Sequence, residues 1–173
     1  MEFSLFSGLL INLLITIGSS IIPVVVGLLL YMICSNKGTI PNWGKLFGLF
    51  FECCCPVVLL LLVYYTVGFN IGRINNIVAC IIAFTISFLA YMPKRYNLDF
   101  SFKKNLIVNI LGLLSCVFKW SFCVSMIGVH EMFGQARLLL HYADLSGMWI
   151  VFGVSFAIIF ILELMKHVAK EKL

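Results

Sequence analysis

The chain has 173 residues, of which 62% are hydrophobic and 11% charged, and its formal net charge is +5. Soluble domains are about a quarter charged, so this composition excludes a soluble globular protein and leaves room for one membrane domain only. The positive charges stand between apolar stretches and do not gather in a patch, which excludes a nucleic-acid-binding protein.

Five apolar stretches along the chain are long enough to span a membrane, which takes about 20 residues. Each stretch is continuous and does not alternate as barrel strands do, and only a helix satisfies its backbone polar groups within one segment. The sequence therefore predicts an all-α integral membrane fold of five transmembrane helices in a single domain, over the ranges 8–34, 46–69, 74–92, 105–129 and 145–163.

The first stretch is expected to stay in the protein as a span, because it lacks the basic start and the cleavage site of a signal peptide. Lys and Arg counts then orient the helices. Nine of these residues lie in the first and third predicted loops and in the tail, against Arg73 and Arg137 on the other side. This asymmetry predicts a cytoplasmic C-terminus and an outside N-terminus.

The segment 130–146 is the longest predicted outer loop and has the pattern of a short amphipathic helix. Gln135, Arg137 and His141 fall off its apolar face, which consists of Met132, Phe133, Ala136, Leu139, Leu140 and Ala143. Such a helix lies flat on the outer surface or plugs a pathway.

Two charges fall inside predicted spans, Glu52 and Lys119. A charge at the bilayer centre costs at least about 2.5–3.5 kcal/mol, so these residues either line a polar path or bind a partner subunit. Alternatively, Glu52 sits at the cytoplasmic interface and Lys119 snorkels. With the polar residues of the later spans, the candidate substrate path is Glu52, Thr85, Ser87, Lys119, Ser121 and Ser125.

Enzymatic and metal chemistry have weak support. The seven Cys lie in or beside apolar stretches, as small packing residues do. Cys123 and His130 could form an intramembrane protease pair, but seven residues is about two helical turns, too far for contact within one helix. We expect no enzyme, no metal site and no cofactor bound by this chain.

Four stretches resemble the membrane permease subunits of polar-amino-acid ABC importers, the type I importers for histidine, arginine or glutamine. They are Gly8–Ile33, Pro56–Phe69, Ala83–Met92 and Phe118–Met132. The last is the most specific and matches the family pattern at Lys119, Val124, Ser125, Ile127, Gly128, Val129 and Glu131.

The chain also departs from that family. Cys53-Cys54-Cys55, Trp120 and His130 replace the family's Arg-Gly-Thr, Asp and Pro. The link Pro93–Lys104 replaces a longer cytoplasmic loop and lacks the Glu-Ala-Ala coupling helix that docks on the ATPase. The residues left for docking are Lys94, Arg95, Asp99, Phe100, Phe102 and Lys103.

The resemblance implies a multi-pass subunit of an ABC importer in the bacterial cytoplasmic (inner) membrane. Its partners would be lipid, an ordinary permease subunit, an ATPase that holds the ATP, and a solute-binding protein. The shortened link implies a degenerate permease in a heteromeric complex. The alternative is an accessory or regulatory membrane subunit that kept the fold and lost transport.

Overall fold

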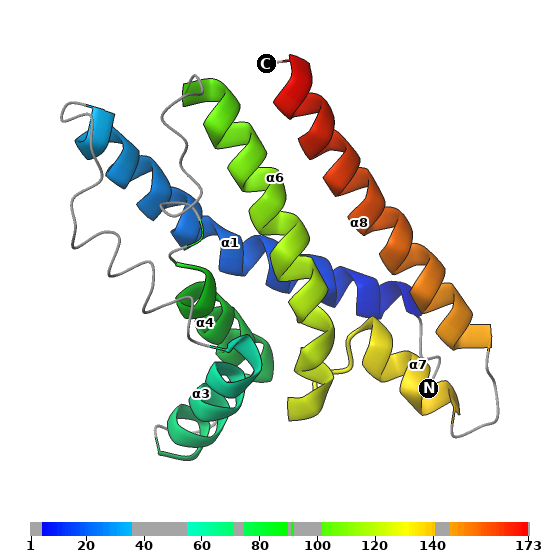
Figure 1. Ribbon diagram of the computed structural model, residues 1–173. Coiled ribbons are helices and arrows are strands. Elements are labelled where there is room, and N and C mark those ends of the chain that lie inside the picture. Colours follow the sequence, from blue (N-terminus) through cyan, green and yellow to red (C-terminus); the bar gives the residue numbers. More distant parts are fainter. Residues whose placement is uncertain are drawn as a thin grey trace.

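The computed structural model describes residues 5–35, 55–70, 75–89, 91, 102–140 and 146–172 (Figure 1). All regular secondary structure in these ranges is helical, which confirms the prediction of an all-α chain. The elements are, in chain order, α1 (Leu5–Ser35), α3 (Pro56–Asn70), α4 (Asn76–Phe88), α6 (Phe102–Ser121), the 3-10 helix η1 (Phe122–Ile127), α7 (Met132–Leu140) and α8 (Ser146–Lys172).

Three of these helices are long and apolar enough to cross a membrane, through Leu5–Leu29, Leu106–Ile127 and Ser146–Glu171. The 15 residues of α3 extend about 22 Å, less than the roughly 30 Å of a hydrocarbon core. The predicted second and third spans reach beyond α3 and α4 into residues outside the described ranges. The count of five spans therefore stays a prediction.

One end of each of the three long helices lies on the same side of the molecule. Figure 1 shows the C-terminal end of α1, the start of α6 and the C-terminal end of α8 at the top, with the N-terminus and α7 toward the bottom. These top ends adjoin the two loops and the tail in which the sequence collects its positive charges. Which side of a membrane they face stays a prediction.

A hydrophobic core joins α1, α3, α4, α6 and η1. Ile15, Leu60, Phe84, Leu113 and Val124 are buried at its centre, one from each element. The small residues of α4 are buried as well, and Ile81 of that helix packs against Gly18 of α1. Close packing through small residues is how helices associate in lipid.

The outer surface of α8 is apolar. Trp149, Phe152, Phe156 and Phe160 are exposed along one face, and the rings of Phe152, Phe156 and Phe160 stack at centroid distances of 6.3 and 6.0 Å. In water such a face would favour aggregation. Around a membrane helix it is the expected contact with lipid or with a neighbouring subunit.

Candidate functional site

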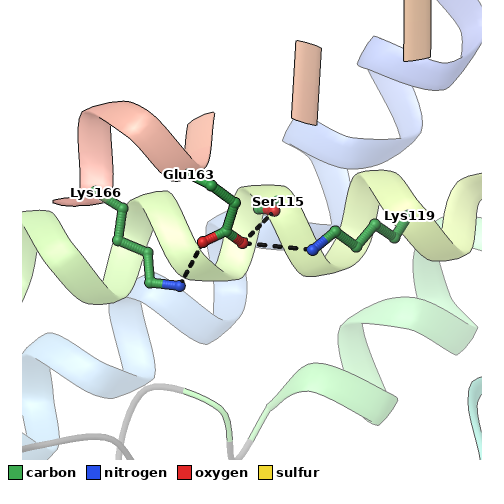
Figure 2. A network of polar contacts seen from close by, with 4 residues as sticks. All are labelled: Ser115, Lys119, Glu163 and Lys166. Atoms are coloured by element: carbon green, nitrogen blue, oxygen red, sulfur yellow. Dashed lines mark hydrogen bonds and ion pairs between the residues drawn. The ribbon is translucent and has the colours of Figure 1, made fainter. Parts of the chain in front are cut away.

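A network of charged side chains joins α6 and α8 (Figure 2). Oε1 of Glu163 on α8 accepts a hydrogen bond from Ser115 Oγ at 2.9 Å. Lys119 Nζ donates to the same oxygen at 3.4 Å. Its other oxygen, Oε2, lies 2.7 Å from Lys166 Nζ. Ser115 and Lys119 are four residues apart on α6, and Glu163 and Lys166 three apart on α8, so each helix presents its pair on one face.

This network is open to its surroundings. The side chains of Lys119 and Glu163 are 48% and 40% exposed, and that of Lys166 is 26% exposed. Phe118 and Ser121 of α6 are almost fully and fully buried, and Cys116 and Trp120 are partly buried. Lys119 is the exposed residue of this stretch, 116–121.

The network also lies within two candidate spans, Leu106–Ile127 and Ser146–Glu171. Exposed charges against hydrocarbon tails are expensive, and such residues usually face a water-filled cavity or another protein. Within a spanning helix, these charges would favour a water-filled cavity or another protein over lipid tails at this face of α6 and α8.

Sequence reasoning found Lys119 but missed its partner. The fifth predicted span ends at Glu163, and α8 continues beyond it to Lys172. The neighbouring Lys166 was the available signal, since a Glu and a Lys three residues apart on one helix can neutralise each other.

Thr85, a predicted residue of the substrate path, donates a hydrogen bond to the backbone of α1. Pro23 lies inside α1 and has no N–H to donate to the carbonyl of Ser19, four residues earlier. Thr85 Oγ1 of α4 donates to that carbonyl oxygen at 3.4 Å. An unsatisfied carbonyl is costly in a membrane, so this hydroxyl has a structural task.

The remaining path candidates do not join the network of Lys119. Ser87 Oγ donates to the carbonyl of Ala83 on its own helix, and Ser121 Oγ to that of Phe118. Ser125 Oγ donates to the carbonyl of Phe122 at 3.3 Å. These hydroxyls bond backward along their own chain, as Ser and Thr often do in helices.

Several predicted residues lie outside the described part of the chain. They are Glu52 of the path and Lys94, Arg95, Asp99 and Phe100 of the docking link. Phe102 and Lys103 are the first residues of α6, described by their backbone only.

A second polar cluster surrounds Glu131, between η1 and α7. Its side chain is fully buried. The carboxylate accepts the backbone N–H groups of Phe133 at 2.6 Å and Gly134 at 2.9 Å, and Asn12 Nδ2 of α1 lies 3.4 Å away. Glu131 thus caps the start of α7 and ties that helix to α1.

The backbones of α1 and of the start of α7 lie in close contact beside the hydrogen bond between Asn12 and Glu131. A Cβ atom on Gly8 of α1 would lie 2.6 Å from the backbone nitrogen of Met132 and 2.8 Å from the carbonyl carbon of Glu131. Only glycine leaves room for α1 to cross α7 at this distance. Asn12 follows one turn later on the same face of α1 and reaches the carboxylate.

The Glu131 carboxyl lies outside the candidate spans, and its pKa is raised above the ordinary value. Burial raises its pKa to about 7, although the hydrogen bonds from Phe133, Gly134 and Asn12 oppose that shift. In the described ranges no Lys or Arg forms an ion pair with it. Glu131 is thus a buried acid whose hydrogen bonds, among the described residues, come from neutral groups.

The same cluster corrects one prediction about α7. Arg137 is exposed, but Gln135, which the pattern placed off the apolar face, is buried, with Nε2 3.1 Å from both Ser7 Oγ and the His130 carbonyl oxygen. The reason is that α7 contacts α1, η1 and α8, so more than one of its faces is covered.

No protein-family model and no curated protein matches the sequence. Among solved structures, the chain is similar to one in the crystal structure of an amino acid ABC transporter with histidines, with a TM-score of 0.76 and 19% identity. The similarity covers 98% of this chain and 94% of that chain. The chain therefore has an ABC permease-like fold, as the sequence resemblance predicts.

Proposed function

We propose that this protein is a membrane-spanning subunit of an ABC importer for amino acids or similar small polar solutes. The observation that carries the proposal is the similarity of fold to an amino acid ABC transporter along almost the entire length of both chains. The exposed charges of Lys119 and Glu163 within two candidate spans support it, because a polar path or a partner subunit would give them a suitable environment.

The same proposal gives the chain a dependent role beside an ordinary permease subunit and an ATPase in a bacterial cytoplasmic membrane. The predicted link Pro93–Lys104 has twelve residues, too few for a coupling helix of more than about two turns beside its connecting residues. Its sequence has no Glu-Ala-Ala element. The second permease would then provide the main mechanical connection to ATP hydrolysis.

Purification of the tagged chain in mild detergent tests the proposal. We expect an ATPase and a second permease to co-purify, and the complex in proteoliposomes to accumulate labelled amino acids when ATP is supplied. Replacing Lys94 and Arg95 by Ser should weaken retention of the ATPase, whereas the same change at Lys170 and Lys172 in the tail serves as the control. Recovery of the chain alone would contradict the proposal.

An accessory or regulatory subunit is the second candidate, favoured by the short link between α4 and α6. Such a protein would co-purify with a sensor or another transporter, and uptake by the complex would not depend on it. Deleting the chain from a reconstituted complex separates the two functions, because only a transport subunit abolishes uptake when it is absent.

A further inference from the structure

The ammonium group of Lys119 is weakly engaged within its network. Glu163 Oε1 already accepts Ser115 Oγ at 2.9 Å, and Oε2 lies 2.7 Å from Lys166 Nζ, while Lys119 stands 3.4 Å away. Among the described residues, Glu163 is the polar partner of Lys119, and an ammonium group has three N–H donors. Ser115 and Lys166 therefore hold the carboxylate, and Lys119 keeps donor capacity for another acceptor.

Charge points to the kind of acceptor. Two ammonium groups face one carboxylate, which leaves one positive charge in excess within the candidate spans. Figure 2 shows Lys119 and Lys166 approaching Glu163 from opposite sides, so the excess charge is not enclosed between them. An exposed excess cation attracts an anion, and a carboxylate forms the short charge-assisted bonds that Lys donors prefer.

Position decides where that carboxylate comes from. Lys119 lies 13 residues after the start and eight residues before the end of the candidate span Leu106–Ile127. We propose that Lys119 binds the carboxylate of a small solute, with Ser115 and Lys166 positioning Glu163 so that it does not occupy the lysine. This inference rests on the proposed transport function and assigns its substrate-carboxylate subsite.

Binding of an acid and its amide tests the assignment. L-histidine and L-histidinamide differ at the carboxylate, and their affinities for the purified full complex can be measured by calorimetry. We expect the wild-type complex to bind the acid at least about tenfold more tightly, because a charged hydrogen bond is lost with the amide. Lys119→Met should remove the preference, and Lys119→Arg should keep it.

The matched control is Lys170→Met, which removes an exposed lysine of α8 outside the network and should leave the preference unchanged. Equal affinity for acid and amide in the wild type, or an unchanged preference in Lys119→Met, would overturn the inference. So would dissociation of the complex in Lys119→Met, since Lys119 would then bind a partner's carboxylate. In the first two cases an intact complex with ATP-driven uptake would leave the proposed function standing.

Discussion

Two glutamates of this chain occupy opposite environments. Glu131 is fully buried and accepts backbone N–H groups without a cation, whereas Glu163 is 40% exposed and lies between two lysines. Glu131 joins α1 to α7 near the N-terminal end, and Glu163 joins α8 to α6 within the spans.

This difference suggests a structural role for Glu131 and a binding role for the exposed group around Glu163. Every contact of Glu131 ends on the protein's own backbone or on a buried side chain, so a change there should affect folding. The contacts of Glu163 leave Lys119 partly free and exposed, so a change there should affect binding more than stability. The following four substitutions test this division, from the largest expected effect to the smallest.

Gly8→Val should prevent α1 from crossing α7. Its Cβ atom would meet the backbone of Met132 and Glu131 at 2.6–2.8 Å, and backbone atoms cannot yield as a flexible side chain does. We expect a loss of more than about 3 kcal/mol, measured as little monodisperse protein in detergent. Gly153→Ala is the control, because nothing lies within 4 Å of its Cβ position; equal losses in both would refute the crossing.

Glu131→Ala should destabilise the protein by about 2–3 kcal/mol, because it removes a helix cap and leaves buried donors without an acceptor. The midpoint of thermal unfolding in detergent measures the effect. A midpoint equal to that of the wild type would mean that the start of α7 does not need this carboxylate.

The pH dependence of stability should also depend on Glu131. Its folded pKa is about 7 against an ordinary value of 4.5, so between these values the folded state binds more protons than the unfolded state. Stability should therefore be greatest below about pH 4.5 and fall as the pH rises to about 7.

Glu131→Gln should flatten that pH slope, because the amide does not titrate. Two amide oxygens of the cluster, Asn12 Oδ1 and Gln135 Oε1, are buried with no hydrogen-bond partner among the described residues, so a proton on Glu131 adds a donor where acceptors are in excess. Thermal unfolding of both proteins across this pH range provides the comparison, and an unchanged slope in the variant would assign the pH dependence to other groups.

Glu163→Gln should change stability least, by at most about 1 kcal/mol, because partly exposed ion pairs contribute little. The same thermal measurement applies, beside Glu131→Gln as the matched change at the buried site. A larger loss at Glu163 than at Glu131 would reverse the comparison between the two glutamates.

The helical class was accessible from the sequence because apolar length acts over whole segments, whereas the five spans and their orientation stay predictions. The helical class and the permease-like fold were predicted correctly, and α7 lies within the predicted outer amphipathic segment. Lys119 was recognised because a charge in the middle of an apolar stretch is expensive wherever its partner lies.

The contacts between helices were not accessible in the same way. The task of Thr85 depends on Pro23, 62 positions earlier in the chain, and no periodic pattern links the two residues. Glu131 matched a family position, but its burial follows from Gly8 and Asn12 of α1 lying against it. Such pairings arise from the way helices pack, which a single sequence does not encode as a local signal.

The hydrogen bond from Thr85 to the Ser19 carbonyl connects α4 to α1 at the position of Pro23. Because Pro23 leaves that carbonyl without a donor of its own helix, separation of α4 from α1 would expose a bare oxygen to hydrocarbon. The two helices are therefore expected to shift together as a rigid pair during any rearrangement of the domain. Motion within the protein would then occur at other helix contacts.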